Sequence, residues 1–157
     1  MAHYRYLNVN DDKIKRNDCV TRAITLASGL SYPTVRRKLR YTARLLGCEK
    51  LCVSCYEFLI REVLGGVPVN CENMSINEFA DLHPQGTYLL RINGHITTLI
   101  DFTLYDIWDC RKKIITNAWK CSNNLIALGG VKPALFYFSK NIKKISKKLR
   151  KTLDKAF

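Results

Sequence analysis

Apolar residues in the first half of the chain recur at every third or fourth position, which is the spacing of one helix face. Gly29 and Gly47 mark the ends of the first two periodic segments, and Pro33 opens the second of them. Two Ser-x-x-Glu patterns, which begin at Ser54 and Ser75, are typical of capping boxes at helix starts. The pattern therefore predicts four helices, which begin at Cys19, Pro33, Ser54 and Ser75.

From Gly86 onward, the apolar period changes from helical to extended. Short turn pairs at residues 93–94 and 101–102 separate apolar segments that are typical of hairpin strands. Helices first and strands afterwards predict an α+β domain, in which N-terminal helices pack on a C-terminal antiparallel sheet. The predicted antiparallel strands occupy residues 86–92, 95–100, 103–108 and 112–119, with a last strand over 134–139.

Much of the positive charge lies at the end of the chain. The 157 residues carry 26 Lys and Arg against 13 Asp and Glu, a formal net charge of +13, and residues 140–157 contribute eight of the bases and one of the acids. Ile142, Ile145, Leu149 and Leu153 form one apolar stripe in this segment. We therefore predict a domain over 1–139 and a basic amphipathic helix or tail over 140–157. The tail either lies on the domain or contacts an anionic partner, namely nucleic acid, an acidic protein or a membrane surface.

The composition excludes two broad classes of protein. With 47% hydrophobic residues the chain is too apolar to be disordered throughout. Its apolar runs are shorter than the ~18 residues that cross a bilayer, and its first residues lack the apolar core of a signal peptide. We therefore expect a cytoplasmic protein with no transmembrane segment. In that setting its seven cysteines are thiols and not a disulfide framework.

Cys19 stands at the first turn of a predicted helix, where the helix dipole and unpaired backbone N–H groups favour a thiolate. The same N–H groups can stabilise an oxyanion that forms when the thiolate attacks a carbonyl. A nucleophilic cysteine also needs a base, and His95 stands at the start of a predicted strand, directly after a turn. A buried structural thiol and a simple turn residue are the alternative roles for Cys19 and His95.

The hairpin register predicts a third member of this group. If residues 101 and 102 form a two-residue turn, His95 lies opposite Trp108. Side chains alternate between the two faces of a sheet, so Asp106 shares the face of His95 and Asp109 points to the other face. A loop one residue longer reverses the faces, which makes Asp109 the alternative orienting carboxylate. The expected arrangement is an imidazole held by the carboxylate of Asp106 and shielded by the indole of Trp108.

The order of Cys on a helix, His on a strand and Asp on the next strand resembles that of papain-like cysteine peptidases. NDCVTRA at residues 17–23 resembles the nucleophile helix of that superfamily, and GHITTLID at 94–101 is similar to its histidine strand. YDIW at 105–108 matches the place where these enzymes carry Asn-x-Trp or Asp-Pro. More closely, RNDCVTRA together with residues 86–110 looks like a group of small phage-encoded proteins, related in outline to bacteriocin-processing peptidases.

This resemblance implies a Cys19 nucleophile, a His95 general base and acid, and an Asp106 orienter. It implies a papain-like fold and hydrolysis of a peptide, isopeptide or related amide bond in a peptide or protein substrate, through a thioester. We expect no cofactor and, for a phage-encoded protein, the host cytoplasm as its location.

One position departs from the superfamily pattern. Papain-like enzymes commonly place a Gln shortly before the Cys as an oxyanion donor, and Lys13 occupies that position here. Asn17, the backbone N–H of Cys19, or Lys13 itself would have to supply the donor. The alternative function is a catalytically idle papain-fold binding module, whose basic tail contacts nucleic acid or an acidic host protein.

The remaining cysteines include a cluster at Cys48, Cys52 and Cys55, with Cys71 further along the chain. A structural zinc site requires two short pairs, and only Cys52 and Cys55 have that spacing. We therefore expect no metal and predict that these thiols pack around the third helix.

Arg22 lies one helical turn after Cys19. Its guanidinium is expected either to tie the helix to the sheet through a carboxylate, Asp109 or Asp101, or to contact the substrate.

Overall fold

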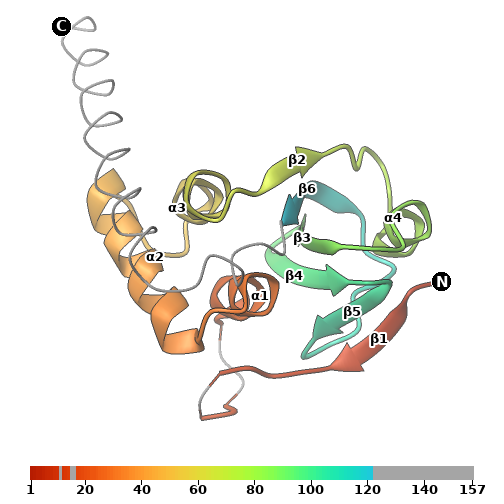
Figure 1. Ribbon diagram of the computed structural model, residues 1–157, viewed down its shortest axis with the longest axis horizontal. Helices are drawn as coiled ribbons and strands as arrows, with labels where there is room; N and C mark the ends of the chain where they lie inside the picture. Colours follow the sequence, from red (N-terminus) through yellow and green to blue (C-terminus); the bar gives the residue numbers. More distant parts are fainter. Residues whose placement is uncertain (11, 15–16, 122–157) are drawn as a thin grey trace, which may run out of the picture. The chain divides into compact units, whose positions relative to one another are not determined.

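The computed structural model describes residues 1–10, 12–14 and 17–121, which form an α+β arrangement around one six-stranded sheet (Figure 1). The helices are α1 (Cys19–Ser28), α2 (Tyr32–Leu46), α3 (Val53–Phe58), the π-helix η1 (Leu59–Val63) and α4 (Ile76–Leu82). The strands are β1 (His3–Tyr6), β2 (Val67–Val69), β3 (Thr87–Ile92), β4 (His95–Ile100), β5 (Thr103–Asp106) and β6 (Ile115–Cys121).

The sheet has the strand order β1-β5-β4-β3-β6-β2. Strands β3, β4 and β5 form the predicted antiparallel meander, but β6 pairs with β3 and not with β5. The prediction of a purely antiparallel sheet is wrong because β1, at the start of the chain, pairs in parallel with β5. The sheet is therefore mixed, and the N-terminal segment forms an edge strand that runs along the whole of β5.

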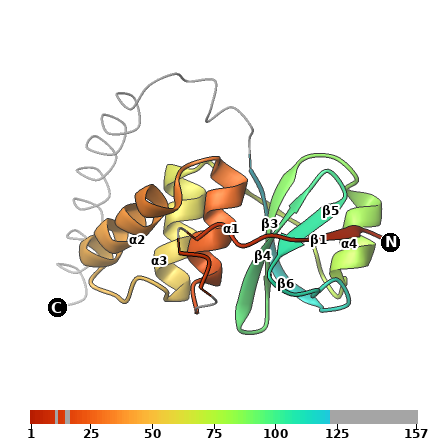
Figure 2. The same cartoon turned by 90° about the horizontal axis from the view of Figure 1, so that it is seen from below.

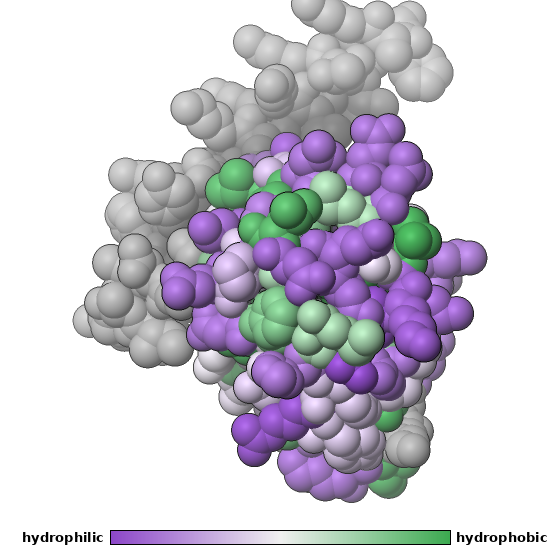
Figure 3. All heavy atoms as spheres, turned by 90° about the vertical axis from the view of Figure 1, so that its right-hand side faces the viewer, coloured by the Kyte–Doolittle hydropathy of each residue, from purple (hydrophilic) through white to green (hydrophobic). Residues whose placement is uncertain are grey.

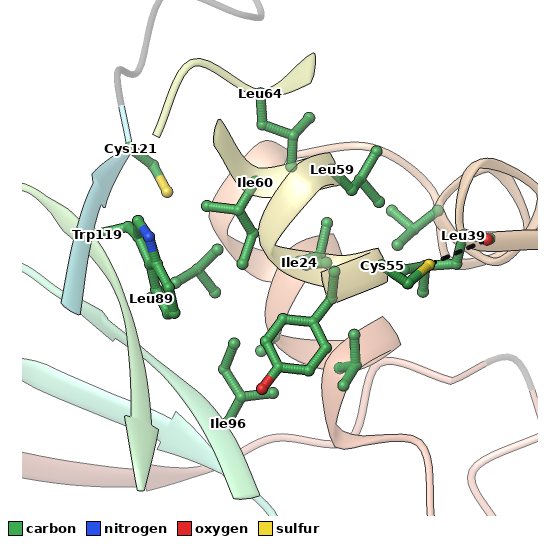
Figure 4. Close-up of a cluster of buried hydrophobic side chains, with 14 of the residues drawn as sticks. Ile24, Leu39, Cys55, Leu59, Ile60, Leu64, Leu89, Ile96, Trp119 and Cys121 are labelled. Carbon is green, nitrogen blue, oxygen red and sulfur yellow. Dashed lines mark hydrogen bonds between the residues drawn. The ribbon is translucent and has the colours of Figure 1, made fainter. Parts of the chain in front are cut away.

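Helices α1, α2 and α3 cover one face of the sheet and α4 covers the other (Figures 1 and 2). Strand β3 contributes to both cores, because its side chains alternate between the faces. Leu89 packs in the cluster beneath α1 to α3, together with Ile24, Ile60 and Trp119, as Figure 4 shows. Leu90 packs in the second cluster, with Phe79 of α4. The sheet is therefore buried between two layers, which fixes α1 against β4.

The helix boundaries confirm all four predicted helix starts to within one residue. Asp18 and Ser31 occupy the N-cap positions of α1 and α2 without a side-chain capping bond, and the capping box at Ser75 is present in full. The predicted capping box at Ser54 is wrong, because α3 begins one residue earlier, at Val53, with Cys52 as its N-cap. This shift leaves the Ser54 hydroxyl free to contact the thiol of Cys52, 3.2 Å away.

Several predictions lie outside the described residues: the strand over 134–139, the basic helix over 140–157, and the boundary between 139 and 140. None of the helices that the structure describes is long and apolar enough to cross a membrane. On the face seen in Figure 3, hydrophobic side chains form separate patches among hydrophilic ones.

Candidate active site

Cys19 is the first residue of α1, directly after the N-cap Asp18. Helix α1 is held against β4 by the Ile24 and Ile96 side chains of the first core and by a hydrogen bond from Thr98 Oγ1 to the Ala23 carbonyl oxygen, at 3.0 Å. This packing brings the start of the helix to the start of the strand. There the thiol of Cys19 is hydrogen-bonded to the side chain of His95.

His95 is the first residue of β4, and its Nε2 lies 2.6 Å from Oδ2 of Asp106. The predicted register is confirmed, since Thr98 pairs with Tyr105 in the hairpin. The ring of Trp108 lies beside the imidazole, with 5.3 Å between ring centroids. Because Nε2 is engaged by the carboxylate, Nδ1 is the ring nitrogen that remains for Cys19. The structure therefore brings together the three side chains that the sequence singled out.

The environment shifts the pKa values of this pair in opposite directions. Burial raises the pKa of the Cys19 thiol, but hydrogen bonds from the His95 side chain and the Ile96 backbone outweigh it and lower the pKa overall. Burial lowers the pKa of His95, but the hydrogen bonds to Asp106 and Cys19 and their negative charges raise it to about 9. Both shifts favour a thiolate next to an imidazolium at neutral pH.

A buried ion-pair network lies behind the Asp106 carboxylate. Arg22 forms an ion pair with Asp18 one turn earlier in α1, and its Nη2 lies 3.8 Å from Asp106 Oδ1. The Tyr32 hydroxyl donates to Asp18 Oδ2 at 2.7 Å. The side chains of Arg22 and Asp106 are 5% and 4% exposed, so these charges interact with little screening by solvent. Alternating charges thus run from Asp18 through Arg22 and Asp106 to His95.

This network corrects the expected partner of Arg22. Among the described residues its carboxylate partners are Asp18 and Asp106, and not Asp109 or Asp101. Sequence reasoning missed Asp18, although its spacing of four residues from Arg22 on a helix was a usable signal.

The alternative site residues lie in other contacts. Asp109 binds Arg111, with Oδ2 2.7 Å from Nη2, and this guanidinium lowers the pKa of the carboxyl. Asp106, and not Asp109, is therefore the carboxylate that holds His95. Asn17 is exposed, two residues before Cys19. The Lys13 Nζ donates to the Asn8 carbonyl oxygen at 3.2 Å, within its own loop.

Cys110 is a further thiol at the site that sequence reasoning did not identify. The ligand atoms of His95, Asp106 and Cys110 lie within 4.8 Å of one another. The His95 imidazole and the Asp106 carboxylate are hydrogen-bonded to each other, and the Cys110 thiol is hydrogen-bonded to Thr97. Burial and the nearby Asp106 charge raise the pKa of Cys110 to about 12. This thiol therefore stays protonated and does not compete with Cys19 as a nucleophile.

The chain matches no protein-family model, no curated protein and no solved structure. The chemistry of the site therefore follows from its own residues. A partly exposed thiol with a lowered pKa, a base within hydrogen-bond contact and a carboxylate behind that base form an arrangement suited to nucleophilic attack on a carbonyl.

Proposed function

We propose that this protein is a papain-like thiol hydrolase that cleaves a peptide, isopeptide or related amide bond. The single observation that carries the proposal is the hydrogen-bonded chain from Cys19 through His95 to Asp106. The motif resemblance of residues 17–23 and 94–108 to papain-like peptidases points to the same chemistry. In thiol-dependent acyl transfer, such side chains serve as nucleophile, general base and acid, and orienting carboxylate.

The reaction begins with attack of the Cys19 thiolate on the substrate carbonyl carbon, which forms a tetrahedral oxyanion. The imidazolium of His95 then gives its proton to the leaving amine as the C–N bond breaks, which leaves a thioester on Cys19. Neutral His95 next takes a proton from water, whose oxygen attacks the thioester carbon. The C–S bond then breaks, which releases the carboxylic acid product and restores the Cys19 thiolate beside the His95 imidazolium. Asp106 keeps the imidazole oriented and stabilises its charged form in both steps.

The start of α1 supplies donors for the oxyanion. The first backbone N–H groups of a helix have no partners within the helix, and they point toward a ligand at its N-terminus. The backbone N–H of Cys19 belongs to this set, and the exposed Asn17 side chain precedes it by two residues. In this proposal these two groups act where papain-like enzymes use a Gln, because Lys13 is bound within its own loop.

The test is labelling with an electrophilic peptide probe, followed by mapping of the modified cysteine. We expect labelling at Cys19 and its loss in Cys19→Ala and His95→Ala. The matched control is Cys71→Ala, since Cys71 is buried within the second core cluster and its pKa is raised by burial. Cys71→Ala should label like the unmodified chain. Labelling that is unchanged in Cys19→Ala would contradict the proposal of a thiol hydrolase. It would favour the alternative function, a catalytically idle binding module.

A further inference from the structure

Three thiols gather where α2 ends and α3 begins. Cys48 follows the last turn of α2, Cys52 is the N-cap of α3, and Cys55 lies within α3. The backbone turns back on itself between them, since the Cys52 N–H donates to the Glu49 carbonyl oxygen at 3.1 Å. This turn brings the side chain of Cys48 into hydrogen-bond contact with those of Cys52 and Cys55.

The three thiols differ in accessibility. Cys48 and Cys52 are partly exposed, whereas Cys55 is buried. The thiol of Cys55 points toward α2 and donates to the Leu39 carbonyl oxygen at 3.5 Å, as the dashed line in Figure 4 shows. An oxidant in solution therefore reaches the first two thiols and not the third.

The two accessible thiols also differ in reactivity. The Ser54 hydroxyl, 3.2 Å from the Cys52 sulfur, lowers the pKa of Cys52 by hydrogen bonding to it. The hydrogen bond with Cys52 raises the pKa of Cys48 instead. Because the thiolate is the species that attacks an oxidant, Cys52 is the attacking sulfur and Cys48 is the resolving sulfur.

We propose that Cys48 and Cys52 form a reversible redox site, which closes to a disulfide when a peroxide oxidises it. The proposal rests on the contact between the two thiols, on their shared exposure and on the Ser54 hydroxyl beside one of them. It is independent of the hydrolase activity, because neither residue belongs to the group around Cys19.

The reaction takes two steps. The Cys52 thiolate attacks one peroxide oxygen, so that an S–O bond forms, the O–O bond breaks and two electrons pass from sulfur to the peroxide; hydroxide leaves and takes a proton to become water. Cys48 then attacks the sulfur of this sulfenic acid, so that the S–S bond forms, the S–O bond breaks, and the hydroxyl leaves with the Cys48 proton as water. A dithiol reductant reverses the change by thiol–disulfide exchange.

The chain offers a direct readout of this bond, because Lys50 lies between the two cysteines. Trypsin cleaves after Arg44, Lys50 and Arg61 and so separates Cys48, in residues 45–50, from Cys52 and Cys55, in residues 51–61. We propose treating the full-length Cys19→Ser chain with hydrogen peroxide, alkylating the remaining thiols and digesting it without reductant. Cys19→Ser removes the reactive thiol of the candidate active site.

We expect a disulfide-linked pair of peptides, 45–50 with 51–61, which disappears when a dithiol is added. In the matched control Cys55→Ala the linked pair should persist, since the buried thiol takes no part. In Cys48→Ala, dimedone should trap a sulfenic acid on Cys52. A linkage that is lost in Cys55→Ala, or oxidation that stops at sulfinic acid with no linked pair, would overturn the proposal.

Discussion

The His95 Nε2 lies 2.6 Å from Asp106 Oδ2, across a two-residue hairpin whose register places both side chains on one face of the sheet. This contact orients the imidazole so that its other nitrogen is directed to Cys19. It also raises the pKa of His95, because the carboxylate stabilises the charged ring. This contact and the charges behind it determine how the site responds to substitution and to pH.

Substitutions of Asp106 should distinguish its role in orienting the His95 imidazole from the effect of its negative charge. In Asp106→Asn the amide oxygen can still accept the imidazole N–H, so peptide-probe labelling of Cys19 should slow by on the order of tenfold. In Asp106→Ala the acceptor is lost, and labelling should slow by on the order of 10²–10⁴-fold, the usual contribution of a positioned general base. Asp109→Ala is the matched control and should label normally. Equal slowing in the Asp109 and Asp106 variants would contradict the assignment of the orienting carboxylate.

The titration of His95 should depend on Cys19. Both the thiol and Asp106 raise the pKa of His95 to about 9. In Cys19→Ser the neighbouring negative charge is lost, so the pKa of His95 should fall toward the ordinary value of about 6.5. Nitrogen-15 NMR of the imidazole measures both values. An identical pKa of His95 in the two proteins would show that the thiol and imidazole do not form an ion pair.

The same raised pKa makes stability depend on pH. A group whose pKa is higher in the folded state stabilises the fold fully below its unfolded value, about 6.5, and loses this effect as the pH rises through the folded value, about 9. The difference in unfolding free energy between the unmodified chain and His95→Gln should therefore shrink between pH 6.5 and 9. Urea denaturation at several pH values measures it. A difference that grows over this range would contradict the His95–Asp106 ion pair.

The Arg22 guanidinium should contribute strongly to stability. Arg22→Met leaves Asp18 buried without its cation and removes one of the two cationic side chains beside Asp106, and breaking a buried ion pair in this way costs about 3–5 kcal/mol. Urea denaturation should show this loss in unfolding free energy. The matched control is Arg36→Met, because Arg36 is exposed on α2, and it should change the value by less than about 0.5 kcal/mol. A cost for Arg22→Met as small as that of the control would refute the network.

Local sequence patterns predicted the helices and the β3–β4–β5 meander because those features depend on neighbouring residues. Gly29 and Gly47 end α1 and α2, and both adopt positive φ, at 67° and 64°. Asp101 and Phe102 also adopt positive φ, which gives the two-residue turn and hence the register of His95 with Asp106. The candidate site was predictable to this extent because one hairpin fixes two of its three members.

The remaining features depend on contacts between distant segments. The side chains of strand β1 are mostly exposed and do not alternate between buried and exposed positions. Its strand conformation therefore depends on the parallel pairing with β5. The position of β6 beside β3 depends on the path of residues 107–114, which no local periodicity encodes. The same reason applies to the contact of Arg22 with Asp106, which joins α1 to the end of β5, whereas Asp18 lies only four residues before Arg22.

The central claim is that Cys19 is an activated thiolate, and the rate of its alkylation tests that claim most directly. Iodoacetamide at pH 6.5 should modify Cys19 at least about tenfold faster than each of the other six cysteines, as mass mapping measures, because His95 lowers its pKa. In His95→Ala this advantage should disappear. Equal rates at all seven cysteines, or a Cys19 that does not react in the folded protein, would contradict the account.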